Sequence, residues 1–303
     1  MNGLGESELD VSVVLPVYNE AGHLTQEIKR IQAALERSPY TFEIIVVDDG
    51  STDGSAEELG RMDGIRLIRF RSNQGTGTAR KAGTRAAKGR VVVWTDVDMT
   101  YPNEEIPDLV SQLEGFDQVV GARTSERGGA KALRVPAKWT MRRLASYLVE
   151  KPIPDLNSGF RAFRRPVGEQ FMPLLPKGFS CVSTMTMAFL INGYSVKYVP
   201  IEYLPRVGKS KFHWWRDTYR YLTQIVRMVM SYQPLRIFVP VGLALLTLGT
   251  GKLVFDLTVH PLRVATNTLL ILFAALQLFT VGLLADLVVS ATKRDYTVEP
   301  ADS

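Results

Sequence analysis

Two aspartates, Asp96 and Asp98, stand two positions apart at the end of an apolar stretch, residues 91–95. Carboxylates with this spacing can share a hard divalent cation whose other ligands are the oxygens of a diphosphate. Such an ion would neutralise the charge of a departing diphosphate. Two aspartates around one residue also occur in solvated turns. The metal-site interpretation is favoured here because the pair follows a predicted buried strand.

Two further polar clusters follow apolar runs in the same way. Tyr18 and Glu20 come after residues 11–16, and Asp48 and Asp49 come after residues 42–47. The two aspartates could accept hydrogen bonds from a base and a ribose. The same segment could instead form a turn and a helix cap, and both interpretations can hold together.

Cationic side chains later in the chain could bind a phosphate. Arg142 and Ser146 are spaced i and i+4, so they share one face of a predicted helix, and an arginine fork suits a phosphate. A solvated helix face is the alternative. Arg206, Lys209 and Lys211 stand just before an aromatic stretch at which a lipid phosphate would lie.

The segments around these residues alternate between strand and helix patterns. Apolar β-branched runs predict strands at 11–16, 42–47, 65–70, 91–95 and 118–120, and helical spacing predicts helices at 22–37, 55–61, 77–88 and 104–113. This alternation predicts an α/β domain with a mainly parallel sheet. Ligands of such sheets bind beyond the carboxyl ends of the strands. The three polar clusters described above are expected at these strand ends.

Two long apolar runs, about 237–259 and 266–289, are each long enough to cross a bilayer. Two buried helices of a soluble core are the alternative, but little chain remains to cover them. The short connection makes the pair a hairpin. Residues 1–211 are therefore predicted as the catalytic domain, 212–235 as an interfacial amphipathic helix rich in aromatic and arginine side chains, and 236–303 as a transmembrane hairpin with a short tail.

Positive charge flanks the two ends of this hairpin more than its connecting loop. The cations at the ends are Arg216, Arg220, Arg227, Arg236, Lys293 and Arg294, whereas the loop offers mainly Arg263. This bias predicts that both termini and the predicted domain 1–211 lie in the cytoplasm. With its two spans the chain is expected to be a multi-pass protein of the cell (inner) membrane. Lys252 and Asp286 lie within the apolar runs, where a charge is costly and often functional, although Lys252 could also reach an interface.

The overall charge is modest. Of 303 residues, 36 are Lys or Arg and 31 are Asp or Glu, which gives a net charge of +5. That balance suits anionic lipid or phosphate but is too small to indicate nucleic acid, which we do not expect as a partner. The single cysteine, Cys181, excludes an internal disulfide and fits a core position.

The motifs in their order resemble glycosyltransferase family 2, in the branch of dolichyl-phosphate mannosyltransferases and bacterial polyprenyl-phosphate glycosyltransferases. The resemblance covers nearly the whole chain. Its marks are VLPVYNE at 14–20, VDDGSTDG at 47–54, NQGTG at 73–77, DVDMTYP at 96–102, GAR at 121–123, DLNSGFR at 155–161, VPI at 199–201 and RVGKSK at 206–211. Any one of these could arise by chance, whereas the ordered set is specific.

The resemblance implies a nucleotide-diphospho-sugar transferase (GT-A-like) fold and a role for each matched residue. It assigns Pro16, Tyr18, Glu20, Asp48 and Asp49 to the nucleotide of a UDP- or GDP-sugar. It assigns Asp96 and Asp98 to Mg²⁺ or Mn²⁺ and the diphosphate, with Thr100 at a position where the mannosyltransferases carry a glutamine that contacts metal. It assigns the acceptor phosphate to Arg123, Arg142, Ser146, Arg206 and Lys211.

The implied reaction is an inverting, metal-dependent transfer of one sugar to polyprenyl phosphate, either undecaprenyl or dolichyl phosphate. Residues 179–187 offer no carboxylate where family members that glycosylate hydroxyl groups carry a base, and a phosphate needs none. For the loop 155–161, a structural turn in which Arg161 pairs internally is as good an interpretation as substrate contact. Transfer to a lipid or protein hydroxyl and non-catalytic binding of a nucleotide sugar are the alternative functions. The sequence leaves open whether the chain forms a homo-oligomer.

Overall fold

The computed structural model describes residues 9–124, 143, 146–147, 149–204, 223, 226, 229–230, 233–260 and 263–293. The chain divides into two compact units, Met1–Leu222 and Thr223–Ser303, which we describe separately. The predicted boundary at residue 211 and most of the predicted interfacial helix at 212–235 lie outside the described residues, so both stay predictions.

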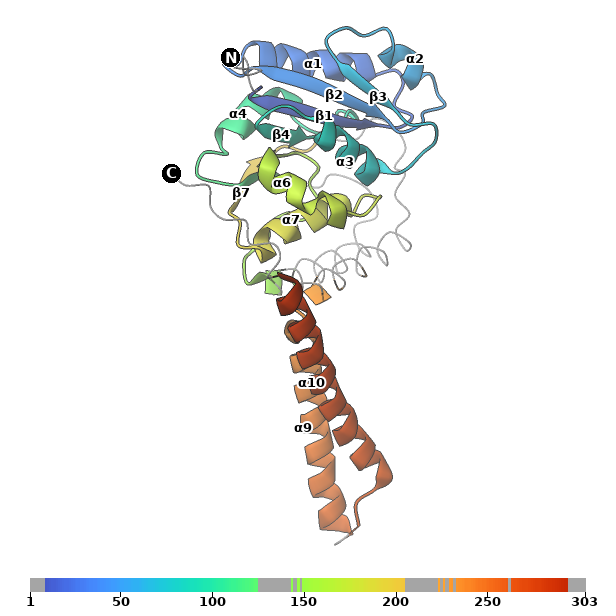
Figure 1. Ribbon diagram of the computed structural model, residues 1–303, viewed down its shortest axis with the longest axis vertical. Coiled ribbons are helices and arrows are strands. Elements are labelled where there is room, and N and C mark those ends of the chain that lie inside the picture. Colours follow the sequence, from blue (N-terminus) through green and yellow to red (C-terminus); the bar gives the residue numbers. More distant parts are fainter. Residues whose placement is uncertain are drawn as a thin grey trace, which may run out of the picture. The chain divides into compact units, whose positions relative to one another are not determined.

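The first unit contains one seven-stranded sheet in the described residues (Figure 1). Its strand order is β3-β2-β1-β4-β6-β5-β7. The strands are β1 (Val11–Val17), β2 (Phe42–Asp48), β3 (Arg66–Arg69), β4 (Val91–Trp94), β5 (Gln118–Arg123), β6 (Arg161–Arg164) and β7 (Val196–Ile201). Only β6 runs antiparallel to its neighbours, so the predicted mainly parallel sheet is confirmed.

The helices of this unit are α1 (Leu24–Glu36), α2 (Ser55–Leu59), α3 (Thr76–Ala86), α4 (Ile106–Ser111), α6 (Arg165–Phe171) and α7 (Cys181–Ile191), with short 3₁₀ turns η1 (Asn103–Glu105) and η2 (Met172–Leu174). Alternate residues of β1 serve the two faces of the sheet, as the pleat of a strand requires. Val13 and Leu15 pack into one buried cluster with Leu24 and Ile28 of α1. On the other face, α3 lies so close to β1 that a side chain at Gly83 would collide with Val14.

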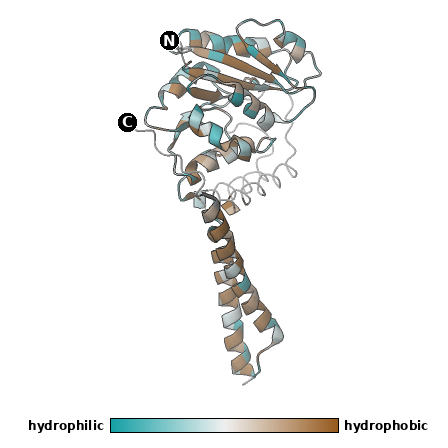
Figure 2. Ribbon diagram, viewed as in Figure 1, coloured by the Kyte–Doolittle hydropathy of each residue, from teal (hydrophilic) through white to brown (hydrophobic). Residues whose placement is uncertain are grey.

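The second unit is a helical hairpin of α9 (Leu235–Val259) and α10 (Thr266–Lys293). Both helices are apolar along most of their length, as Figure 2 shows, and each is long enough to cross a membrane. Most of their apolar side chains are not buried; Phe255, for example, is 62% and Leu287 is 68% exposed. This exposure contradicts the alternative of two helices inside a soluble core.

The two charges predicted to be unusual in these helices differ in their surroundings. The ammonium of Lys252 lies 3.1 Å from Asp256 Oδ1, one turn further along α9. The other oxygen of Asp256 accepts hydrogen bonds from the Ala265 N–H and the Thr268 hydroxyl, where α10 begins. This cluster ties the ends of the two helices at the turn. Asp286 is half-buried in α10.

Candidate active site

The carboxyl ends of β1, β2 and β4 lie side by side where the strand order reverses. The chain adds β2 and β3 on one side of β1 and then returns to place β4 on the other side. Open sheets of this kind bind ligands beyond the strand ends at that position. Pro16 is paired in register with Val47, so the predicted nucleotide residues of both strands share one edge.

The loops after β1 and β2 are joined by hydrogen bonds. The Asn19 N–H donates to Ser51 Oγ at 3.0 Å, and the Thr52 N–H donates to Asn19 Oδ1 at 2.8 Å. Asn19 adopts a left-handed backbone conformation with φ of 53°, which asparagine tolerates better than most residues. Tyr18 and Glu20, on either side of it, are half-buried at this edge, and Glu20 lies 3.3 Å from the His23 ring.

The two aspartates at the end of β2 have different surroundings. Asp49 accepts hydrogen bonds from the backbone N–H groups of Gln74 (2.6 Å) and Gly75 (2.8 Å), one on each oxygen, and so fixes the start of α3. Burial raises the pKa of Asp49 above its ordinary value. Asp48 accepts the Ser51 N–H at 3.0 Å through Oδ1. Asp49 therefore has a structural role of the kind expected from a turn and cap, and its contact with a nucleotide stays a prediction.

Asp96 is held by a buried arginine of α3. Arg80 Nη2 donates to Asp96 Oδ1 at 2.6 Å, and its guanidinium lies 5.6 Å from the centre of the Trp94 ring. The Arg80 side chain is 3% exposed, whereas that of Asp96 is 33% exposed. Burial alone would lower the pKa of Arg80, but the carboxylate of Asp96 outweighs it and raises that pKa above its ordinary value, so Arg80 stays protonated. Arg80 thereby restricts the orientation of the Asp96 carboxylate.

Asp98 is supported by the residue two positions later. The Thr100 hydroxyl donates to Asp98 Oδ1 at 2.6 Å, and the Thr100 N–H points at the same oxygen at 3.3 Å. Met99 between them has a left-handed φ of 59°, which bends the chain back on itself. Thr100 is fully buried, so its observed contact is with the carboxylate, and its predicted role as a metal ligand stays a prediction.

The loop that precedes β6 packs against Asp96. The Gly159 N–H donates to Tyr101 Oη at 2.8 Å. A methyl group on Gly159 would lie 2.9 Å from both Arg80 Nη2 and Asp96 Oδ2, closer than side-chain carbons approach other atoms in proteins. Glycine is required here because two separate chain segments meet at the carboxylate.

Arg161 pairs internally, as expected if the loop 155–161 is a structural turn. Its guanidinium is fully buried and donates to the Val182 carbonyl (2.7 Å), to Thr186 Oγ1 (3.0 Å) and to the Ser158 carbonyl. Burial lowers its pKa to about 10. These bonds fasten the loop to α7.

Arg123 and Asp155 form a two-pronged ion pair at the end of β5. Arg123 Nε lies 2.7 Å from Asp155 Oδ2, and Nη2 lies 2.9 Å from Oδ1. Burial would raise the pKa of Asp155, but the hydrogen bonds and charge of Arg123 outweigh it and lower that pKa. Arg123 also lies over the Tyr203 ring at 5.2 Å, and the N–H of the next residue, Leu204, donates to the Thr100 carbonyl at 2.9 Å. The ion pair is therefore connected to the Asp98 side of the site.

The remaining predicted phosphate residues are placed only in part. Ser146 is half-buried, and its hydroxyl accepts the Ile153 N–H at 3.2 Å. Arg142, Arg206 and Lys211 lie outside the described residues. Their contact with an acceptor stays a prediction.

The described residues test whether a divalent cation fits here. No group of three or more His, Cys, Asp or Glu side chains among them is placed to hold a metal ion. Asp96 and Asp98 alone supply two carboxylates, and one of them is partly open to solvent. Mg²⁺ usually takes one or two protein carboxylates and completes its shell with phosphate oxygens and water, so the pair fits an ion bound together with a diphosphate.

Sequence reasoning missed three residues that position this pair. Arg80 follows the NQGTG motif and Tyr101 lies within the DVDMTYP motif, but the sequence pattern predicts no role for either residue. Asn103 Nδ2 donates to the Asp96 carbonyl (3.0 Å) and to Glu27 Oε1 (2.6 Å), which links the loop to α1. No spacing rule signals these contacts, because each joins segments far apart in the chain.

This fold is that of a GT-A-like glycosyltransferase domain. Residues 12–171, more than half of the chain, match the family described as "Glycosyl transferase family 2", and residues 233–291 match the "GtrB C-terminal hairpin". The chain belongs to glycosyltransferase family 2.

Two relatives align along most of the chain. The undecaprenyl-phosphate 4-deoxy-4-formamido-L-arabinose transferase of Pseudomonas fluorescens (strain SBW25) is 30% identical over 299 residues, which cover 90% of this chain and 80% of that protein. The dodecaprenyl-phosphate galacturonate synthase of Rhizobium johnstonii is 25% identical over 308 residues, which cover 95% and 90%.

Solved structures share the fold of the first unit. Glucosyl-3-phosphoglycerate synthase of Mycobacterium tuberculosis, in complex with Mn²⁺, UDP-glucose and phosphoglyceric acid, superposes with a TM-score of 0.59 at 22% identity. The match covers 73% of this chain and 80% of that one. At this identity the likeness supports the fold alone.

Proposed function

We propose that this glycosyltransferase moves a single sugar from a nucleotide sugar to the phosphate of a polyprenyl phosphate, with inversion at the anomeric carbon. The observation that carries the proposal is the state of the carboxylates around the site. Asp155 is neutralised by Arg123 and has a lowered pKa, which makes it a poor general base near neutral pH. α7, all of which is described, contains no carboxylate.

An acceptor that is already anionic removes the need for a base. A phosphate monoester carries negative charge near neutral pH, so its oxygen can attack the anomeric carbon directly. One carbon–oxygen bond forms to the acceptor phosphate while the bond to the nucleoside diphosphate breaks from the opposite face. The names of both relatives point to the same acceptor class, since they specify undecaprenyl phosphate and dodecaprenyl phosphate.

On the donor side, we propose that Pro16, Tyr18, Glu20 and Asp48 contact the nucleotide beyond β1 and β2, with Asp49 fixing the neighbouring loop. We propose that Asp96 and Asp98 hold Mg²⁺ or Mn²⁺, a choice supported by the Mn²⁺ and UDP-glucose in the structural relative. The ion, when bound, supplies positive charge to the leaving diphosphate.

Three residues of the chain prepare the carboxylate pair for this task. Arg80 restricts the orientation of Asp96 through their ion pair. Thr100 restricts the orientation of Asp98 through the hydrogen bond that its hydroxyl donates. Gly159 leaves the space in which Asp96 lies.

On the acceptor side, we propose that the phosphate is met by Arg123, Arg142, Ser146, Arg206 and Lys211. Arg123 contributes positive charge from a position already fixed by Asp155. A fixed guanidinium loses little conformational freedom when it meets a phosphate.

We propose that α9 and α10 cross the inner membrane and that the catalytic unit and both termini lie in the cytoplasm. The exposed apolar surface of both helices supports the crossing. The excess of arginine and lysine at the ends of the hairpin supports the orientation. The polyprenyl chain of the acceptor would then lie in the same bilayer as the hairpin.

The test is a panel of UDP- and GDP-sugars, radiolabelled in the sugar, incubated with the full chain, undecaprenyl phosphate and Mg²⁺ or Mn²⁺. One donor is expected to give an organic-extractable product that mild acid hydrolyses. Asp98→Asn should lower the amount of product by about 10³-fold, and Asp63→Asn, at an exposed position outside the site, should not lower it. Absence of transfer from every donor would refute the proposal.

A further inference from the structure

The segment that joins α6 to α7 exposes two large apolar side chains. Leu174 is 44% exposed and Phe179 is 52% exposed. Among its described residues the first unit exposes four large apolar side chains, so half of them stand within these six positions, 174–179. Single exposed apolar residues are ordinary on a protein surface, whereas apolar residues that gather in one place mark a contact with a partner or a membrane.

The backbone of the 174–179 segment is fixed against α3. The Leu175 carbonyl accepts a hydrogen bond from the Lys81 ammonium at 3.0 Å, and the Lys177 carbonyl accepts one from the Gly77 N–H at 2.7 Å. The approach is so close that a methyl group on Gly77 would collide with the Pro176 carbonyl oxygen. The two exposed apolar side chains are therefore presented by a preorganised backbone, which loses little conformational freedom when it binds.

Positive charge gathers beside these apolar side chains. Lys177 is exposed within the segment, and α3 adds Lys81 and the exposed Arg85, one turn apart. Burial lowers the pKa of Lys81, and the charges of Arg85 and Lys177 lower it further, so both cations lie close enough to act on it. None of the three forms an ion pair with a carboxylate in the part of the chain that the structure describes. Their charge is therefore uncompensated and suits an anionic partner.

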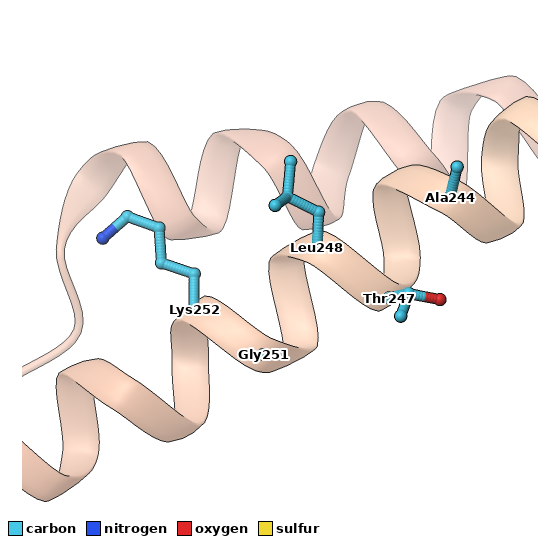
Figure 3. A pocket seen from close by; sticks show the side chains of 5 residues that line it. All are labelled: Ala244, Thr247, Leu248, Gly251 and Lys252. Carbon is cyan, nitrogen blue, oxygen red and sulfur yellow. The ribbon is translucent and has the colours of Figure 1, made fainter.

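The hairpin surface has a hollow of a different kind. A groove of about 660 Å³ on α9 is lined by Ala244, Thr247, Leu248, Gly251 and Lys252 (Figure 3). Lys252 is the one charged residue among these five, and its ammonium lies 3.1 Å from Asp256 Oδ1. The charge of that groove is thus neutralised within its own helix. The groove does not offer an anion the positive charge that the 174–179 segment offers.

The chain keeps the 174–179 segment near a bilayer. The described range 149–204 of the first unit ends at Leu204, and α9 begins at Leu235. The residues between them, 205–234, can span at most about 100 Å, since an extended chain covers ~3.4 Å per residue. The first unit is therefore confined to the neighbourhood of the membrane that the hairpin would cross. Such a tether raises the effective concentration of the lipid surface, so a contact too weak to hold a free protein can form.

We propose that the 174–179 segment docks on the anionic surface of the membrane. In this arrangement Leu174 and Phe179 enter the boundary between headgroups and acyl chains, and the three cations Lys81, Arg85 and Lys177 face lipid phosphates. Apolar side chains beside cations are the combination by which peripheral segments bind anionic lipid. The inference rests on the proposed crossing of the membrane by α9 and α10.

The docking segment is connected to the candidate active site through α3. The Lys177 carbonyl holds the first turn of this helix, and Asp49 holds its start through the Gly75 N–H at 2.8 Å. Arg80 of the same helix donates to Asp96 Oδ1 at 2.6 Å. A membrane contact at 174–179 therefore fixes how the carboxylate pair is oriented toward the lipid surface, where the phosphate of a lipid acceptor lies.

The test is fluorescence quenching on the full chain reconstituted in vesicles. Gly178→Cys is labelled with a thiol-reactive fluorophore, because a side chain at this position meets nothing within 4 Å and leaves the apolar and cationic residues intact. The vesicles contain phosphatidylglycerol and a phospholipid that carries a nitroxide near its headgroup. Glu36→Cys is the matched control, since it is exposed at the end of α1, on the other face of the sheet from α3. Wild type gives the background, because its only cysteine, Cys181, is buried.

Quenching at position 178 should exceed quenching at position 36 several-fold, and equal quenching at the two positions would overturn the proposal. Lys177→Gln, read at the same label, should lower the ratio of docked to undocked protein about fivefold in vesicles rich in phosphatidylglycerol. Lys29→Gln removes an exposed cation of α1 and should leave the ratio unchanged. Phe179→Ser should lower the ratio in phosphatidylcholine vesicles as well, because its contribution is apolar. A wild-type ratio in both Lys177→Gln and Phe179→Ser would also overturn the proposal.

Two further measurements separate this inference from the proposed function. Alkaline carbonate should leave the protein in the membrane fraction, and release of the protein would show that the hairpin does not cross the bilayer. Sugar transfer by the same preparations reports the catalytic unit independently. Equal quenching at positions 178 and 36, with transfer and membrane retention intact, refutes the docking alone.

Discussion

Replacing Gly159 with alanine is expected to damage catalysis more than folding. The added methyl group would lie 2.9 Å from Asp96 Oδ2 and from Arg80 Nη2, and ordinary contact begins at 3.4 Å. Relief therefore requires a movement of about 0.5 Å (3.4 minus 2.9) by one of these groups or by the loop. A misplacement of ~1 Å in an active site can cost about 100-fold, so half that movement predicts a loss of roughly tenfold in kcat/KM.

Overpacking of this kind also costs about 1–3 kcal/mol of folding stability. The measurements are the transfer rate with the identified donor, Mn²⁺ binding by electron paramagnetic resonance, and the free energy of unfolding of each variant. Gly178→Ala is the matched control, because a methyl group there meets nothing within 4 Å. A Gly159→Ala protein with wild-type transfer and wild-type Mn²⁺ affinity would refute the packing argument.

Asp98→Asn should lower the transfer rate by about 10³-fold relative to wild type. Thr100→Val removes a charge-assisted hydrogen bond to Asp98, so it should weaken Mn²⁺ binding by roughly tenfold relative to wild type. Unchanged Mn²⁺ affinity in Thr100→Val would contradict its supporting role. Arg80→Met should lower the free energy of unfolding, measured in urea, by about 2 kcal/mol. This is less than the usual cost of breaking a buried ion pair, because Asp96 is 33% exposed, and Arg80→Lys should recover part of the loss. The pKa of Asp155 is lowered in the folded state, so its ion pair should stabilise the fold fully above about pH 5 and lose that contribution as the pH falls below 4. Asp155→Asn should therefore be less stable than wild type at pH 7 and approach it at pH 3, and parallel stability curves would contradict this.

The sequence predicted the nucleotide half of the sheet well. β1, β2 and β4 are apolar β-branched runs buried on both faces, and such runs are typical of parallel strands. β6 was missed, because its four residues, Arg161–Arg164, begin and end with arginine and show no alternation. Its pairing with β4 depends on contacts that join residues about 70 positions apart, such as Val91 with Arg164.

The candidate site was predicted as a set of strand ends but not as a set of contacts. The positions of Asp96 and Asp98 follow from the rule for parallel sheets, whereas the ion pair with Arg80 depends on how α3 packs on β1 and β2 and contacts Trp94 of β4. The pairing of Arg123 with Asp155 likewise joins a strand end to a distant loop. Such contacts are fixed by tertiary structure and leave no periodic trace in the chain.

In the proposed reaction the nucleophile is a phosphate oxygen that needs no general base. The most direct measurement compares undecaprenyl phosphate with undecaprenol as acceptors, for the full chain and its identified donor sugar. We expect transfer to the phosphate, blocked by EDTA and restored by Mn²⁺ or Mg²⁺, with no transfer to the alcohol. Transfer to undecaprenol at a comparable rate would contradict it, because a hydroxyl acceptor requires a base that neither Asp155 nor α7 supplies.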